Sequence, residues 1–332
     1  SNPNDPMPTR RIFSLTLLAT CAATLSTPTL AQAPYPDRPV KVIVALPAGG
    51  SVDMIARVVS QKLAAEMGQP FVVDNRAGAS GQIGVPAVAK AAPDGYTLMV
   101  SPASFLTTNK SIFKTLPYNP ETDFTPITKL VNQPMVLVVR DKARFATPAD
   151  VLAAAKANPG KLTYASSGDG SAHHLAGLMF TNRTAVDMLH VPYKCGTPAT
   201  TVLMGGVVDM AFSPLPEALP HIKAGKLHPV GILADKRAST APDIPTLKEG
   251  GVNNVVLSAW IGLLAPAKTP QPVIDKLNQS VRTMLHSPDM KAKLQEAGME
   301  SAVDEAKPLQ QVISEEIKIH AELVKAAGLV PQ

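Results

Sequence analysis

Cysteine is nearly absent from this chain, whose 332 residues contain only Cys21 and Cys195. So few cysteines exclude a small disulfide scaffold and a four-cysteine zinc site. Aromatic residues make up only 4% of the chain and no basic run is interleaved with them, so we expect no nucleic-acid partner. No apolar run reaches the ~18–20 residues of a membrane-spanning helix, which argues against an integral membrane protein.

Length and composition indicate a folded protein of two domains. The 332 residues are too many for one ordinary core, 45% of them are apolar, and the 32 prolines are spread along the chain instead of clustering in a linker. The formal net charge of +5 is a mild bias that slightly favours anionic ligands.

The first 33 residues have the pattern of a cleavable signal peptide. An Arg-Arg pair at residues 10–11 precedes an apolar stretch over residues 12–25, and the Ala-Gln-Ala pattern at residues 31–33 predicts cleavage at its end. We therefore expect a periplasmic protein that is exported by the Sec or the twin-arginine route. Met7 is a candidate native start, which would leave residues 1–6 outside the natural chain.

Apolar periodicity predicts an alternation of strands and helices. The β-branched run at residues 40–46 is typical of a buried strand, and the apolar spacing from Val52 to Leu63 is helical. This alternation favours an α/β fold with mixed, mainly parallel sheets flanked by helices. Further strands are expected at residues 71–74, 96–100, 135–140, 162–165, 189–191, 209–212, 229–233 and 260–264, and C-terminal helices at 273–285 and 309–324.

No long polar linker separates the two expected domains, so we expect the chain to cross between them on strands. The crossings are predicted near Val136 and Ser258. The first domain would then be discontinuous and comprise residues 34–136 and 257–332, and the second would comprise residues 137–256.

Three turns rich in glycine and serine each follow a predicted strand and open a predicted helix. Glycine lets backbone N–H groups approach a ligand, a helix N-terminus offers unpaired N–H donors, and serine adds a hydroxyl group. Together these features predict an anion-binding site without a formal cation, although plain turn chemistry explains any one turn alone. The ligand-binding candidates are Ala48, Gly49, Gly50, Ser51, Ser80, Ser166, Ser167, Gly168, Gly170 and Ser171.

Neighbouring residues have both structural and ligand-binding interpretations. Asp53 lies in the first turn of its helix, where interaction with the helix dipole and ligand contact are equal alternatives. His173 and His174 point about 100° apart on a helix, so they do not chelate one ion from a single face. We expect no metal and no cofactor, and we take His173 as a cleft candidate whose alternative is a surface or capping position.

A secreted hydrolase that uses Ser171 or Cys195 is a second functional hypothesis. The Gly-x-Ser-x-Gly pattern of a nucleophile elbow is absent at Ser171, and spacing implies no base for either residue. Once the signal is removed, Cys195 is the only cysteine, so no internal disulfide can form.

Eight short motifs, taken together and in order, resemble the substrate-binding proteins of tripartite tricarboxylate transporters, the Bug receptor family. The resemblance covers essentially all of residues 34–332, with Cys195 at a position where the family usually has glycine. The motifs are YPDRP at 35–39, PAGGSVD at 47–53, DNRAGASG at 74–81, PDGYTL at 93–98, YASSG at 164–168, VPYK at 191–194, GGVVD at 205–209 and WIGLLAPA at 260–267.

The resemblance implies a two-domain periplasmic binding protein fold of type II-like architecture that closes on a small organic carboxylate, a dicarboxylate or an aromatic acid. Amino acids and neutral amides stay open as further ligand classes. It implies no catalysis, a monomeric receptor, and delivery of the ligand to transporter membrane subunits. A receptor for a membrane histidine kinase is the alternative. The distal end of the cleft would be lined by Ser101, Ser104, Thr197, Pro198 and Ala199, with Asp209 of the matching segment as a further candidate.

Overall fold

A computed structural model describes residues 35–303, 305 and 307–331, and the predicted signal peptide lies outside them. No helix of the described part is both long and apolar enough to span a bilayer. The elements in chain order are β1 (Val40–Val44), α1 (Ser51–Met67), β2 (Phe71–Asn75), η1 (Ala79–Gly81), α2 (Gly84–Ala89), β3 (Thr97–Pro102), α3 (Ala103–Thr107), α4 (Asn109–Ile112), β4 (Phe124–Val139), α5 (Pro148–Ala157), β5 (Thr163–Ser166), α6 (Ala172–Thr184), β6 (Leu189–Pro192), α7 (Gly196–Met204), β7 (Met210–Pro214), α8 (Leu215–Lys223), β8 (His228–Ile232), β9 (Ser258–Pro266), α9 (Gln271–His286), α10 (Pro288–Glu296), β10 (Glu300–Ser301) and α11 (Leu309–Ala326).

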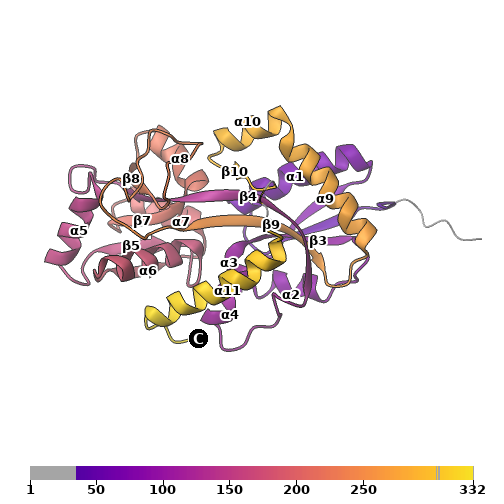
Figure 1. Cartoon of the computed structure of the whole chain (residues 1–332), viewed down its shortest axis with the longest axis horizontal. Coiled ribbons are helices and arrows are strands. Elements are labelled where there is room, and N and C mark those ends of the chain that lie inside the picture. The colour runs from indigo at the N-terminus through magenta and orange to yellow at the C-terminus, as the bar shows by residue number, and fades with distance from the viewer. Residues whose placement is uncertain (1–34, 304, 306, 332) are drawn as a thin grey trace, which may run out of the picture. The chain divides into compact units, whose positions relative to one another are not determined.

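The strands join two lobes through one continuous set of pairings (Figure 1). The strand order is β2-β1-β3-β9-β4-β7-β5-β6, and β8 and β10 pair with β4 outside this path. We call lobe 1 the part from β1 to α4 together with the part from β9 to α10, drawn in indigo and orange. Lobe 2 is the part from α5 to β8, drawn in magenta to salmon, and β4 belongs to both lobes.

Strand β4 carries the chain from lobe 1 to lobe 2. From Phe124 to Pro134 it pairs with β9, and from Met135 to Val139 it pairs with β7. Pro134 pairs with Ser258, the first residue of β9, so the return strand starts beside the point where β4 changes partner. The expected domain boundaries at residues 136 and 257 stay a prediction.

The sequence predicts only the second half of β4. The first half contains Pro126, Pro134 and several polar side chains, which weaken a strand pattern. Register shifts between Pro126 and Thr128 and between Lys129 and Val131 let this half pair with β9 despite its prolines. Tertiary pairing, and not local propensity, therefore makes it a strand.

The sheet is mixed, and the two kinds of pairing occupy different places. Strand β1 pairs parallel with β2 and β3, and β5 pairs parallel with β6 and β7. Strands β4 and β9 make antiparallel pairs with each other and with β7 and β3, respectively. The strand–helix alternation predicts the outer parallel units, and the two crossing strands supply the antiparallel centre.

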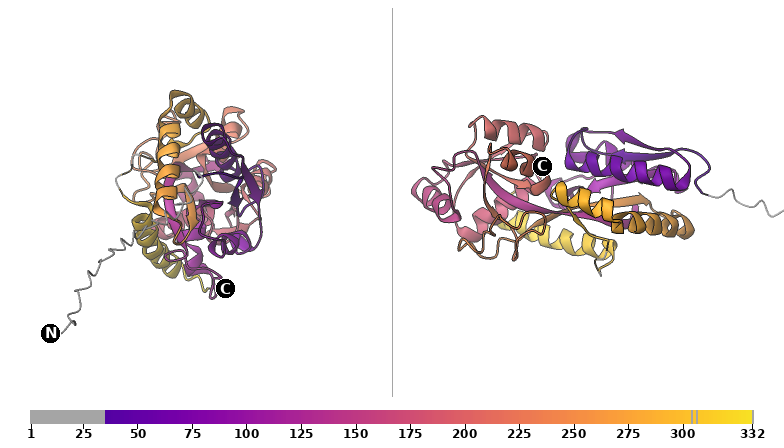
Figure 2. Two further views of the ribbon diagram at one scale, coloured as in Figure 1. Left: turned by 90° about the vertical axis from the view of Figure 1, so that its right-hand side faces the viewer. Right: turned by 90° about the horizontal axis from the view of Figure 1, so that it is seen from above.

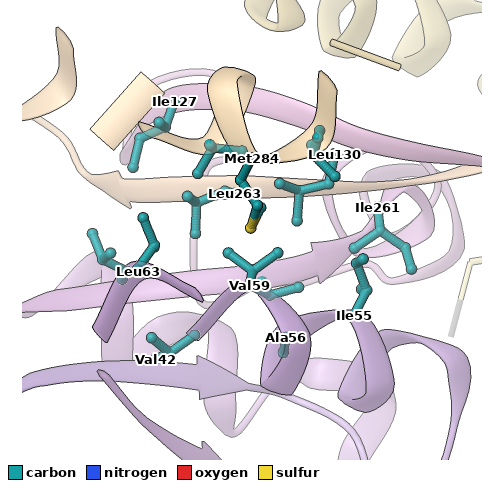
Figure 3. Packing of buried hydrophobic residues seen from close by; sticks show 14 of the residues in the cluster. Val42, Ile55, Ala56, Val59, Leu63, Ile127, Leu130, Ile261, Leu263 and Met284 are labelled. Atoms are coloured by element: carbon teal, nitrogen blue, oxygen red, sulfur yellow. The ribbon is translucent and has the colours of Figure 1, made fainter. Parts of the chain in front are cut away.

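The core of lobe 1 forms where α1 and α9 pack against the sheet and against each other (Figure 3). The predicted helix from Val52 to Leu63 is confirmed, because its apolar side chains are buried. Burial of each large side chain stabilises the fold by about 1.5–3 kcal/mol, so α1 is held firmly with its N-terminus just after β1. The cluster includes Val42, Ile55, Ala56, Val59, Leu63, Ile127, Leu130, Ile261, Leu263 and Met284.

In lobe 2, a close approach of α6 to the sheet fixes the position of that helix. Gly177 of α6 lies against the ring of Tyr164, and a Cβ atom at Gly177 would come within 2.2 Å of that ring. Tyr164 is itself buried between His190 and Phe212, whose rings stack on it and meet its edge. The packing places the N-terminus of α6 directly after the turn at residues 166–171.

Helix α11 contacts both lobes (Figures 1 and 2). It packs against α3 and α4 of lobe 1 and α6 of lobe 2, and Val324 shares a cluster with Ile112 and Leu175. The predicted apolar stripe at residues 309–324 is confirmed as buried. The same holds for most of the stripe at residues 273–285 in α9.

A partly buried carboxyl group joins α11 to the crossing strand β9. The indole Nε1 of Trp260 donates to both carboxyl oxygens of Glu316, at 2.9 Å each. Burial is the main cause that raises the pKa of Glu316 to about 7; the nearby Glu305 and Glu315 act in the same direction, and Trp260 and Lys129 act against it. Ionisation of Glu316 near neutral pH therefore opposes folding.

We expect Glu316→Gln to stabilise the protein at high pH and not at low pH. The folded-state pKa lies above the ordinary value of 4.5, so stability is fully present below pH 4.5 and is lost as the pH rises through about 7. At pH 8.5 the variant should therefore gain roughly 1–3 kcal/mol in urea unfolding, and at pH 5 close to none.

Glu315→Gln is the control on the same helix, because Glu315 is paired with Lys307 and has a lowered pKa. The control should show no gain at pH 8.5. An equal effect of Glu316→Gln at both pH values would contradict the assignment.

Candidate functional site

Two cavities of about 360 and 530 Å³ lie between the lobes. Ser51 of lobe 1 and Ser167 and Glu217 of lobe 2 line both of them, so the cavities are two ends of one cleft. The walls are loops and helix starts that follow strands of both lobes. This is where α/β folds bind ligands, and helix starts present unpaired N–H donors there.

The loop at residues 47–50 is shaped by Asp53. The Asp53 carboxylate accepts hydrogen bonds from the Gly49 amide at 3.0 Å, from Arg57 at 3.0 Å and from Asn75 at 2.9 Å. Burial alone would raise the pKa of Asp53, but these bonds outweigh it and hold the pKa below its ordinary value. The Asp53 carboxylate is thus already hydrogen-bonded within the lobe, where it fixes the loop.

Glycine is required at one of the two loop positions by its backbone angle. Gly49 has φ of +94°, whereas Gly50 has φ of −86° and leaves open space where a Cβ atom would stand. The backbone at Gly50 therefore does not require glycine, but the missing side chain leaves open space at the wall of the cleft.

The turn at residues 166–171 is held by its own serines. The Gly168 amide donates to Ser166 Oγ at 3.1 Å, and the His174 amide donates to Ser171 Oγ at 3.3 Å, which caps α6. Gly168 has φ of +110° and packs against the carbonyl of Tyr193. Ser166 and Ser171 therefore shape the turn, while Ser167 faces the cleft.

His173 links the two sides of the cleft through Glu217. Its Nδ1 lies 2.9 Å from Ser167 Oγ, and its Nε2 lies 3.2 Å from Glu217 Oε2. The other oxygen of Glu217 accepts a hydrogen bond from Ser51 Oγ of lobe 1 at 3.4 Å. The resulting chain, Ser167–His173–Glu217–Ser51, crosses from lobe 2 to lobe 1.

Beside the turn, His174 and His190 stack with ring centroids 3.8 Å apart and planes inclined by only 7°. Asp169 approaches both rings, and ligand atoms of the three residues lie within 4.8 Å of one another, a grouping that the sequence reading missed. A metal ion lies in the plane of each imidazole that binds it, so two parallel stacked rings do not converge well on one ion.

Both stacked histidines are held neutral at physiological pH. Burial, followed by the neighbouring His190, lowers the pKa of His174 to about 4, and burial lowers the pKa of His190 as well. Asp169 acts in the opposite direction on both rings. The stack thus serves as a packed support beneath the turn, since Gly170 donates to His174 Nδ1 at 3.1 Å.

Most of the sequence-predicted candidates line the cleft. The structure brings together Ala48, Gly49, Gly50, Ser51, Asp53, Ser80, Ser104, Ser167, Gly168, Gly170, Ser171, His173 and Thr197. The remaining candidates are placed outside its lining: Ser101, Ser166, Pro198, Ala199 and Asp209.

Four of the five candidates outside the lining have a local physical reason for their position. Ser101 is buried in β3 opposite Gly262, and Ala199 is buried in α7. Ser166 is fully buried, with its hydroxyl 2.6 Å from His190 Nε2. Asp209 precedes β7, whose other end at Pro214 meets the cleft, and it pairs with Arg144 and Thr163.

Sequence reasoning missed the polar residues that come from β4, α4 and α8. Glu217 lies in the first turn of α8, directly after β7, and Asn109 starts α4. Gln133 lies in the half of β4 that was not predicted. The signal for Glu217 was a fourth strand–turn–helix unit, Ser213 to Glu217, which lacks the glycines of the other three.

Comparison with known proteins agrees with this geometry. A model of the tripartite tricarboxylate transporter family receptor matches residues 55–329. BugT of Bordetella pertussis is 36% identical over 295 residues, which are 89% of this chain and 90% of BugT.

Solved structures show the same fold. A protein of R. palustris solved with adipate superposes with a TM-score of 0.86 at 33% identity, covering 90% of this chain and all of that one. The periplasmic binding protein BugD has a TM-score of 0.82 at 35% identity, covering 90% of this chain and 100% of BugD. The chain therefore has the two-domain periplasmic binding protein fold that the motifs predicted, and it belongs to the tripartite tricarboxylate transporter receptor family, the Bug receptors.

Proposed function

We propose that this protein is a periplasmic receptor that captures a small organic carboxylate in the cleft and delivers it to the membrane subunits of a tripartite tricarboxylate transporter. The observation that carries the proposal is the meeting of three helix starts, those of α1, α6 and α7, around one cleft. Each start offers backbone N–H groups that have no partner inside its helix. A carboxylate is the small anion that such donors bind without a cation.

Closure of the lobes is the expected consequence of binding. The crossing strands β4 and β9 join the lobes, and their pairing with each other ends at Pro134 and Ser258. A hinge at these residues would bring Ser51 and Ser167 onto the ligand. The adipate complex of the related R. palustris protein supports this type of ligand. We take residues 137–256 as the moving domain.

The receptor is proposed to act as a monomer that meets the transporter in its closed form. A membrane histidine kinase is the alternative partner, and the chemistry of the cleft would be the same for both. We expect the receptor to copurify from solubilised membranes with transporter subunits and not with a kinase.

Carboxylate binding is expected to depend on the low cleft wall at Gly50. In a thermal-shift panel of dicarboxylates, aromatic acids and amino acids, a ligand at 100 times its Kd should stabilise the protein by about 2.7 kcal/mol. Gly50→Val should weaken that ligand at least tenfold by calorimetry without lowering the melting temperature, because the new side chain enters open space at an ordinary φ.

Gly205→Val is the matched control. Gly205 is exposed, its added Cβ would make only ordinary contacts of 3.5 Å or more, and it does not line the cleft. It should bind like the parent. A Gly50→Val protein that binds every panel ligand as tightly as the parent would contradict the site.

A serine hydrolase is the second candidate, because Ser167, His173 and Glu217 are linked in the order of a nucleophile, a base and an acid. The earlier nucleophile candidates fit less well, since Ser171 caps α6 and Cys195 is the residue directly before α7. In serine hydrolases of the α/β-hydrolase type, the amide after the nucleophile stabilises the oxyanion. Here that amide, Gly168 N–H, already donates to Ser166 Oγ, which favours binding over catalysis.

We therefore expect no turnover of nitrophenyl esters that depends on Ser167. Initial rates for the parent and for Ser167→Ala should be equal and should not saturate with substrate. A saturable rate that is lost in Ser167→Ala and retained in Ser171→Ala would establish the hydrolase instead.

A further inference from the structure

The turn at residues 78–81 has an unusual backbone. All four residues have positive φ angles: +137° at Gly78, +47° at Ala79, +52° at Ser80 and +87° at Gly81. The Gly81 amide donates to the Gly78 carbonyl at 3.0 Å, so Ala79 and Ser80 are the central residues of a left-handed turn. Such positions favour glycine or asparagine, because other L residues are strained there. Alanine and serine stay in this conformation only if their surroundings hold them.

Packing explains why the two glycines of the turn stand at its outer positions. A Cβ atom at Gly78 would come within 2.5 Å of the Ile83 side chain, and one at Gly81 within 2.6 Å of the Phe105 ring. These close contacts tie both ends of the turn to lobe 1. The central residues are less enclosed, since Ala79 is exposed and Ser80 is half-buried.

Asn109 holds the strained centre of the turn through its backbone. The Asn109 Nδ2 donates to the Ser80 carbonyl at 2.9 Å. The same nitrogen donates to the Tyr118 hydroxyl at 3.0 Å, and that hydroxyl donates to the Phe105 carbonyl at 2.6 Å. Asn109 and Tyr118 are 1% and 6% exposed, and hydrogen bonds are stronger in such an interior than in water. Tyr118 therefore orients the amide that fixes the turn.

The turn is part of the wall of the larger cavity. Residues 77–81 all line this cavity together with Asn109, whereas Tyr118 lines neither cavity of the cleft. Strained backbone that the surrounding structure holds in place is concentrated at ligand sites. A wall whose shape is fixed in advance also lowers the ordering cost of binding. The strain at Ala79 and Ser80 thus points to a role in the cleft.

We propose that Asn109 is a positioning residue of the ligand cleft, which acts by holding the turn at residues 78–81 in its left-handed shape. This inference rests on the proposed function, because it concerns the wall of the same cleft, and it applies to whichever acid binds there. Glycine adopts positive φ angles about as readily as negative ones. Asn109 is therefore needed less once Ser80 is replaced by glycine.

The test is whether Ser80→Gly makes Asn109 dispensable. Titration calorimetry with adipate, malate, aspartate and benzoate first identifies an acid that the parent binds. Asn109→Leu should weaken binding of that acid at least tenfold in the parent and less than threefold in a Ser80→Gly background. A direct contact between Asn109 and the acid would not be rescued in this way.

Ala185→Gly provides the matched background. Ala185 follows α6 with a φ of +53°, is exposed and lines neither cavity of the cleft. The substitution relieves the same kind of backbone strain at a place that Asn109 does not hold. Asn109→Leu should therefore keep its full tenfold loss in the Ala185→Gly background.

Tyr118→Phe keeps the inference testable if Asn109→Leu does not fold. It removes only the hydroxyl that orients the Asn109 amide. Because Tyr118 lines neither cavity, a loss of affinity would reach the acid through Asn109 and the turn. We expect at least a threefold loss in the parent and less than half of that loss in the Ser80→Gly background.

The outcomes separate the inference from the proposed function. An unchanged Kd in folded Asn109→Leu, or an equal loss in the parent and Ser80→Gly backgrounds, overturns the positioning role and leaves the carboxylate receptor intact. Absence of binding of every panel acid by the parent overturns the proposed function instead. Urea unfolding then decides whether Asn109 holds the turn: Asn109→Leu should lower the unfolding midpoint less in the Ser80→Gly background than in the parent, and an equal lowering would refute it.

Discussion

The antiparallel pairing of β4 with β9 is the constraint on which the rest of the molecule depends. Both strands pass between the lobes, and β4 exchanges β9 for β7 at Pro134 and Met135. That exchange lets two parallel units, each built from strand–helix alternation, face each other with their helix starts around one cleft. Helix α11 adds a second connection, because it packs against helices of both lobes.

Within the cleft, polar residues divide into those that build the walls and those that face the ligand. The side-chain oxygens of Asp53, Ser166 and Ser171 accept hydrogen bonds from backbone amides, so these residues preorganise the loops. The stacked His174 and His190, neutral because they are buried, support the same turn from behind. Preorganised loops reduce the ordering cost that binding would otherwise incur.

The residues left to recognise a ligand are consequently few. Ser51, Ser167, His173 and Glu217 form one hydrogen-bonded chain across the cleft, and Gln133 adds a buried amide nitrogen that has no hydrogen-bond partner in the part of the chain that the structure describes. In the proposed function, affinity comes from N–H groups at the helix starts, which any carboxylate can use.

The sequence alone determined the local units: the helix after Val52, the glycine turns, the apolar stripe of α11 and, through eight motifs, the family. These depend on neighbours along the chain, so periodicity and turn chemistry reveal them. Only the tertiary structure decided the first half of β4, the burial of Ser101 and Ala199, and the entry of Glu217 and Gln133 into the cleft. Those outcomes depend on pairing and packing between distant segments, and a local sequence pattern does not encode such contacts.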